Sequence, residues 1–171
     1  MKKILLTIGL LSSTLFGSSF VAVIYQQSLE EKVHTDNITN MGSLSLGKVK
    51  FGTQFFPIEG DSRIFNAYMD LGYGATKSVQ GTYKNETGNL SYKQVLVNMG
   101  MTMSLNNNIV VFGGPGWSFS ELRIQGTGEE QKSKLNFNGG VAMYFSDSHF
   151  GIVVDYDSAP NTIGAGITYR F

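Results

Sequence analysis

The stretch NTIGAGITYRF, residues 161–171, closes the chain and decides its fold class. Every second residue from Ile163 to Phe171 is apolar or aromatic, and the residues between them are polar or small. Successive side chains of a strand point to opposite faces, so one face of this segment is apolar and the other is polar or nearly empty. Such a segment is either an edge strand on a soluble core or a strand of a transmembrane barrel with its apolar face toward lipid.

The same alternation recurs along the chain in segments of about ten residues, the length of a tilted strand that crosses a bilayer. The pattern predicts eight strands, at residues 20–29, 43–55, 64–75, 90–104, 109–122, 134–145, 150–157 and 161–171. An even number of strands lets the last pair antiparallel with the first, which leaves no open edge in lipid. The predicted fold is therefore all-β: an eight-stranded antiparallel up-and-down transmembrane barrel.

The gaps between these segments alternate in length. Residues 57–63, 105–108 and 146–149 are short, whereas 30–42, 76–89 and 123–134 are long and polar. Outer-membrane barrels combine short periplasmic turns with longer outer loops, and residues 158–160 would complete the outer set. A soluble sandwich would show similar turn signals at both ends of its strands, so the asymmetry favours the barrel without excluding the sandwich.

The composition excludes several classes of function. The formal net charge is +0, so there is no electrostatic case for nucleic acid as a partner. Charged residues make up 15% of the chain, below the roughly 25% usual for a soluble domain. The chain has no cysteine, which rules out disulfides and thiolate metal sites.

The N-terminus has the layout of a secretory signal peptide. Lys2 and Lys3 precede an apolar run at residues 4–11, and a tail of small residues follows. We expect residues 1–19 to be removed, which leaves a barrel over residues 20–171. The alternative is an uncleaved membrane anchor, because residues 4–25 carry no charge and are long enough to span a bilayer.

The second predicted strand changes phase. Leu44 and Leu46 alternate in one phase, whereas Val49 and Phe51 alternate in the other. A bulge inserts one extra residue and shifts the alternation, so the pattern predicts a β-bulge at Gly47.

Without that bulge, Lys48 and Lys50 would face lipid and extend to the headgroups. The fifth predicted strand contains Pro115, which has no N–H for the ladder. We expect a local kink or a lost hydrogen bond there.

The interior of an eight-stranded barrel is just wide enough for side chains, which argues against a diffusion pore. Buried charges need partners, so we expect a structural network of Asp70, Asp155 and Arg170 in which Arg170 pairs with Asp155. A proton or ion path is the alternative. The predicted inward polar residues are Asn66, Tyr68, Asp70, Asn98, Thr102, Asn136, Asn138, Tyr144, Asp155, Thr168 and Arg170.

A catalytic triad would need one of the histidines as its base. The two histidines, His34 and His149, fall in gaps at opposite ends of the predicted barrel and cannot share one site. An acyltransferase or esterase built on His34, Asp36 and Ser43 is one hypothesis, and an exposed loop histidine is the other.

The run Met99, Met101 and Met103 could bind a soft metal, but on a strand of this kind it is better explained as lipid-facing surface. We therefore predict no catalytic residue, no metal and no cofactor.

Several segments resemble the Ail/OmpX family of small outer-membrane barrels. They are GITYRF (166–171), VFGGPGWSF (111–119), IYQQS (24–28), NMGSLSL (40–46) and VVDYDSAPNTIGAGITYRF (153–171). The resemblance implies that Gly166, Tyr169 and Phe171 form a C-terminal insertion signal that the outer-membrane assembly machinery reads. Phe171 would also suit an interfacial aromatic girdle.

The family also implies adhesion to host surfaces, entry into cells or resistance to complement. We therefore expect a monomeric, non-enzymatic protein of the bacterial outer membrane with extracellular loops. Its expected partners are outer-membrane lipid and lipopolysaccharide, the assembly machinery, and host surface or matrix proteins. The alternatives are a purely structural envelope or stress barrel and a lipid-modifying barrel enzyme. The loop residues expected to carry binding are His34, Asp36, Lys84, Glu86, Glu129, Glu130 and Lys132.

Overall fold

The computed structural model describes residues 19–30, 38–40, 43–57, 65–76, 79–83, 86–125, 128–146 and 148–171. Within these ranges no helix is long and apolar enough to cross a membrane. The predicted signal peptide, His34, Asp36 and Lys84 lie outside the described residues, apart from Ser19 at the start of the first strand. The strands are β1 (Ser19–Ser28), β2 (Ile38–Asn40), β3 (Ser45–Pro57), β4 (Phe65–Thr76), β5 (Val79–Tyr83), β6 (Glu86–Ser104), β7 (Ile109–Ile124), β8 (Gly128–Tyr144), β9 (Phe150–Asp157) and β10 (Thr162–Arg170).

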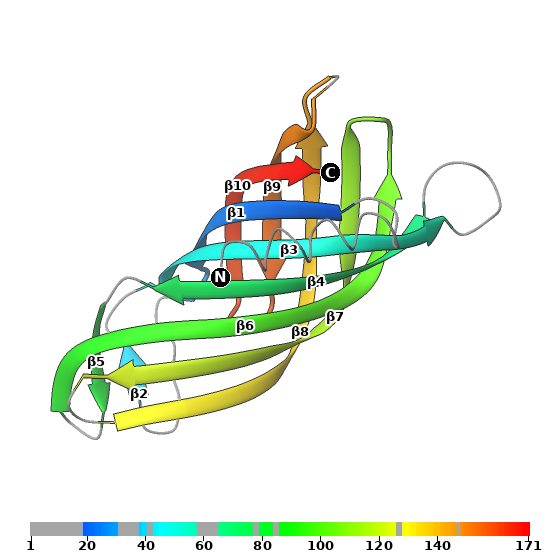
Figure 1. Cartoon of the computed structure of the whole chain (residues 1–171). Coiled ribbons are helices and arrows are strands. Elements are labelled where there is room, and N and C mark those ends of the chain that lie inside the picture. The colour runs from blue at the N-terminus through cyan, green and yellow to red at the C-terminus, as the bar shows by residue number, and fades with distance from the viewer. Residues whose placement is uncertain are drawn as a thin grey trace, which may run out of the picture.

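Eight of these strands close into an antiparallel barrel, which confirms the predicted fold class. Around the ring the order is β1, β3, β4, β6, β7, β8, β9 and β10, and β10 pairs back with β1. The short strands β5 and β2 lie outside the ring and continue the sheet from the far end of β6 (Figure 1). Closure removes the open edges that lipid could not satisfy.

The register of the pairs fixes the stagger of the barrel. One ring of paired residues runs through Gln131, Glu121, Lys93, Ala75, Gly47, Tyr25, Ala165, Val154 and Val141. The ring leaves β8 at Gln131 and returns to the same strand at Val141, so the shear is 10 residues. A stagger of this kind accompanies strands tilted by about 35–45° around an interior that side chains fill.

The outer surface of the ring is an apolar belt. Every one of the eight strands contributes exposed apolar side chains, for example Tyr25, Met99, Phe137, Ile152 and Ile167, which are 43–62% exposed. A contiguous apolar surface of this extent marks contact with a membrane or partner rather than with water. The soluble-sandwich alternative is therefore wrong, and Met99 belongs to the lipid-facing surface.

Three strands run further than predicted. β6 begins at Glu86, β7 ends at Ile124 and β8 begins at Gly128, so most of the expected loops at 76–89 and 123–134 are hairpins. Figure 1 shows β6, β7 and β8 extending well past the other strands, with β5 and β2 beside their tips. Beyond a bilayer the outward side chains of a strand are polar, so the alternation of apolar and polar residues fades there. The strands were therefore predicted to be shorter than they are. We call the end of the barrel at which β6, β7 and β8 protrude the hairpin end. We call the opposite end, with the connections at residues 105–108 and 146–149, the turn end.

The predicted bulge at Gly47 is wrong. β3 pairs with β4 in one unbroken register from Leu46 to Phe55. Leu46, Lys48 and Lys50 all point inward and are no more than 1% exposed, whereas Val49 is 49% exposed. The lysines therefore face the interior although β3 has no bulge, and the expectation that they would then face lipid is wrong. The two leucines and the two lysines lie on the same inward face of the chain.

The expectation of a disturbed ladder at Pro115 is confirmed. Between β6 and β7 the pairing skips Met99 and Gly100, opposite Pro115 and Gly114, and then resumes in the same register. The backbones come very close here, since a Cβ added to Gly114 would lie 2.1 Å from the Met99 carbonyl oxygen.

Candidate functional site

A buried ionic network occupies the middle of the barrel. Lys48 forms ion pairs with Asp155 and with Asp157, the latter at 2.6 Å. Lys50 lies 2.8 Å from Asp70 and 2.9 Å from Asp155. The side chains of all five residues are at most 2% exposed. Two lysines therefore face three carboxylates, an arrangement that needs good geometry and further hydrogen bonds to be tolerated.

Neutral side chains supply those hydrogen bonds. The amide groups of Gln26, Asn98, Asn136 and Asn138 donate to the three carboxylates at 2.8–3.3 Å. The Tyr68 hydroxyl donates to the Asn138 side-chain oxygen at 3.1 Å. The network links six strands of the ring across the lumen, so it cross-braces the barrel.

The prediction for this network was partly wrong. Asp70 and Asp155 lie in it, but the predicted Arg170–Asp155 pair does not form. β9 and β10 pair Asp155 with Gly164, which places Arg170 six residues further toward the turn end. The Arg170 guanidinium instead lies 4.4 Å from the centre of the Tyr144 ring. The inward phase of the lysines in β3 was the signal that sequence reasoning missed.

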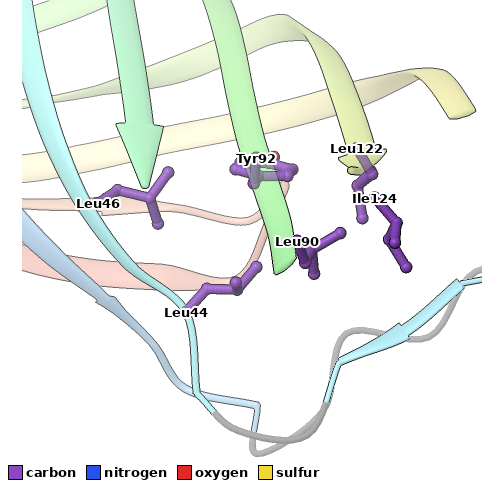
Figure 2. Packing of buried hydrophobic residues seen from close by; sticks show 6 residues of the cluster. All are labelled: Leu44, Leu46, Leu90, Tyr92, Leu122 and Ile124. Atoms are coloured by element: carbon purple, nitrogen blue, oxygen red, sulfur yellow. The ribbon is translucent and has the colours of Figure 1, made fainter. Parts of the chain in front are cut away.

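Apolar clusters bracket the network along the barrel axis. We call the cluster at the hairpin end the mouth cluster, and its members are at most 3% exposed. Figure 2 shows its side chains converging from β6, from β7 and from the start of β3. Its members are Leu44, Leu46, Leu90, Tyr92, Leu122 and Ile124.

Toward the turn end a second cluster fills the lumen, with Phe112 packed against it. Its members are Ala22, Ile24, Val110, Ala142, Tyr144 and Val153. The Lys50 ammonium lies 4.6 Å from the centre of the Phe112 ring, so the second cluster begins directly beside the ionic network, on its turn-end side. Among the described residues the interior is thus apolar, ionic and apolar in turn, which argues for a structural network rather than an ion path.

The described residues predicted to carry binding lie on the hairpins, not on irregular loops. Glu86 is in β6, and Glu129, Glu130 and Lys132 are in β8. Lys132 forms an ion pair with Glu130 at 3.3 Å. The hairpins therefore present their polar side chains from a fixed ladder.

The described residues give the hypothesis of a catalytic triad no support. His34 and Asp36 are outside the described residues, and Ser43 is exposed, with its hydroxyl accepting a 3.5 Å hydrogen bond from Gln27. His149 lies at the turn end, where its Nδ1 is 2.8 Å from the Arg170 carbonyl oxygen. In the described part of the chain no group of three or more His, Cys, Asp or Glu could hold a metal ion.

The C-terminal residues form an aromatic group at the turn end. The Tyr169 ring packs edge-on against Phe150 and Phe171, at centroid distances of 4.8 and 5.1 Å. Phe171 is 49% exposed, and its N–H donates to the Ser19 carbonyl oxygen at 2.8 Å. This position suits a residue of an interfacial aromatic girdle.

A closed eight-stranded ring, an apolar outer belt and a filled interior together define a small transmembrane β-barrel. Neither a protein-family model nor a curated protein matches the chain significantly. Solved structures do match. Ail, the attachment invasion locus protein of Yersinia pestis, is similar in its complex with the heparin analogue sucrose octasulfate, with a TM-score of 0.57 at 16% identity over 92% of this chain and 100% of that one. A second structure of Ail has a TM-score of 0.55 at 17% identity, over 90% of this chain and 97% of that one. The resemblance to the Ail/OmpX class is therefore confirmed for the fold.

Proposed function

We propose that this chain is a non-enzymatic outer-membrane surface protein that binds a partner through its protruding hairpins. The observation that carries the proposal is that β6, β7 and β8 continue as a paired ladder beyond the apolar belt. The interior below them is filled, so the chain offers a surface rather than a passage. Rigid scaffolds that present polar segments beyond a membrane are well suited to binding. The heparin-analogue complex of Ail, which shares the fold, supports a host-ligand role of this kind.

The same proposal places the hairpin end outside the cell. β1 starts and β10 ends at the turn end, so both ends of the barrel would then lie in the periplasm. Gly166, Tyr169 and Phe171 would then be available to the assembly machinery. Outer-membrane lipid and lipopolysaccharide would contact the apolar belt.

Localisation is tested by fractionating cells and running outer-membrane samples with and without boiling. A closed barrel migrates differently until it is heated, and the mature protein should lack residues 1–19. Protease added to intact cells should cleave the β7–β8 hairpin and spare the turn end. A full-length protein in the inner membrane with no heat shift would contradict the proposal.

Binding is tested by replacing residues 120–132, the tip of the β7–β8 hairpin, with a short Asn-Gly turn. Cells that display this variant should lose adhesion to cultured cells or matrix, while the heat shift shows that the barrel is intact. The matched control replaces the connection at residues 105–108, at the other end of the barrel, in the same way. Full adhesion by the hairpin variant would rule out the hairpin as the binding element, and an unaltered protein that gives no adhesion above cells lacking it would favour the purely structural barrel.

A further inference from the structure

A groove of about 400 Å³ lies on the outer face of the barrel, where β4, β6, β7 and β8 run side by side. Tyr73, Val95 and Phe119 line it from one row of paired residues, and these side chains are 39–50% exposed. Lys93 and Glu121 line it from the next row toward the hairpin end. The groove therefore crosses the margin of the apolar belt, with an apolar half and a charged half.

The two charged residues of the groove, Lys93 and Glu121, are opposite each other on β6 and β7. In the part of the chain that the structure describes, neither side chain forms an ion pair or a hydrogen bond. Lys132 also lines the groove, but its ammonium is paired with Glu130 at 3.3 Å. Lys93 and Glu121 are therefore both available to a bound molecule, and their charges cancel.

The stagger of the barrel sets the order of these two charges relative to the membrane. The ring of paired residues that contains them starts on β8 at Gln131, near the hairpin end, and returns to β8 at Val141. Each strand along this ring is therefore shifted toward the turn end by about one residue. Glu121 precedes Lys93 in the ring, so it lies slightly farther from the apolar belt than Lys93 does.

A zwitterionic phospholipid carries its charges in the complementary order. Its phosphate is next to the acyl chains, at the level of Lys93, and its ammonium is farther out, at the level of Glu121. A primary ammonium can donate charge-assisted hydrogen bonds to the Glu121 carboxylate, as Lys93 can to the phosphate. An anionic headgroup would be attracted by the lysine but repelled by the carboxylate. The charge pattern therefore favours an ethanolamine headgroup over a headgroup with net negative charge.

We propose that this groove binds one phosphatidylethanolamine molecule of the surrounding membrane. Its phosphate contacts Lys93, its ammonium contacts Glu121, and the first methylenes of its acyl chains pack on the row of Tyr73, Val95 and Phe119. Girdles of aromatic residues occur at this level of transmembrane barrels. A lipid held there fixes the depth at which β6, β7 and β8 leave the membrane. Such a site requires only the barrel and its apolar belt, so it does not depend on the partner proposed for the hairpins.

Trp117 provides the readout, because it is the single tryptophan and is the next residue to Phe119 on the same face of β7. It is 45% exposed, and its indole N–H donates to the hydroxyl of Ser133, which lines the groove. The full barrel is refolded into vesicles that contain equal parts of phosphatidylethanolamine and phosphatidylglycerol. Bromine, which quenches tryptophan fluorescence on contact, is placed on the acyl chains of one lipid or the other. Both leaflets have the same composition, so the orientation of the barrel does not affect the result.

Quenching should be stronger when the bromine is on phosphatidylethanolamine, and it should correspond to a preference of about threefold or more at this site. Phosphatidylcholine in its place should show a smaller preference, because its quaternary ammonium has no N–H to donate. Equal quenching in the two labelled mixtures, or stronger quenching by phosphatidylglycerol, would overturn the proposal, as would an equal preference for the choline lipid.

The sharpest variant is Glu121→Gln, because it leaves Lys93 without the opposing carboxylate, and the preference should then reverse in favour of phosphatidylglycerol. The matched control, Glu30→Gln, removes the same charge from an exposed position outside the groove and should leave the preference unchanged. Lys93→Gln combined with Glu121→Gln should abolish the preference. The heat shift shows that each variant folds. A Glu121→Gln barrel that still prefers phosphatidylethanolamine, or a control that loses the preference, would refute the groove as the binding site.

Discussion

Replacing Lys48 with Met should destabilise the barrel strongly. Lys48 forms ion pairs with Asp155 and Asp157, and all three side chains are fully buried. Methionine keeps much of the side-chain length but removes the charge, so the network changes from two lysines against three carboxylates to one against three. Removing one partner of a buried ion pair costs about 3–5 kcal/mol, because the other charge stays buried without compensation. We expect a loss of this size in the free energy of unfolding.

The assay is urea unfolding of the barrel refolded into lipid vesicles, followed by the fluorescence of Trp117, the single tryptophan, which is 45% exposed on the lipid-facing belt. The matched control is Val49→Met on the same strand, which faces lipid and should change stability by less than about 0.5 kcal/mol.

A second variant makes the electrostatic explanation refutable. Lys48→Met combined with Asp157→Asn restores the original excess of one carboxylate and leaves Lys50 between its own two partners, Asp70 and Asp155. This double variant should be more stable than Lys48→Met alone by about 1 kcal/mol or more. A single variant as stable as Val49→Met, or a double variant no better than the single one, would show that the network does not stabilise the barrel.

Three further predictions use the same unfolding assay. Gly114→Ala should cost about 1–3 kcal/mol, because the new Cβ would lie 2.1 Å from the Met99 carbonyl oxygen, whereas Gly47→Ala meets open space and should be nearly neutral. Leu90→Ala, in the mouth cluster, should cost about 2–5 kcal/mol and speed amide hydrogen exchange in the β5–β6 hairpin; slow exchange there would disprove a role in ordering the hairpin. Met99→Lys should cost about 2–4 kcal/mol if it lies near the bilayer midplane, while Gln131→Lys beyond the belt should change stability by less than about 0.5 kcal/mol.

The transmembrane part of the fold could be predicted from sequence because a bilayer imposes alternation on both faces of a strand. The predicted strand 150–157 coincides with β9, whose burial alternates residue by residue. Inward polar residues such as Asn98, Asn136 and Asp155 were identified by the same rule and are at most 1% exposed. What alternation cannot supply is the stagger between strands, and with a shear of 10 residues the choice of partner for Arg170 could not be made from sequence.

The hairpin ends were harder to predict because the environment of each face reverses beyond the bilayer. In lipid the outer face of a strand is apolar and the inner face can be polar. In water the outer face becomes polar, and the inner face must be apolar if burial is to hold the hairpins together.

Strand β3 shows this reversal within a few residues. Leu44 and Leu46 point inward at the hairpin end, and Lys48 and Lys50 point inward next to them, with unbroken pairing from Leu46 onward. β7 repeats it, since Leu122 is buried inside the mouth cluster and Ser118 is buried inside the bilayer segment. In a sequence, a reversal of polarity on one face and a bulge that swaps the faces produce the same change of phase. Only the register distinguishes them, and here the constant register shows that the change of phase is a reversal of polarity on one face and not a bulge.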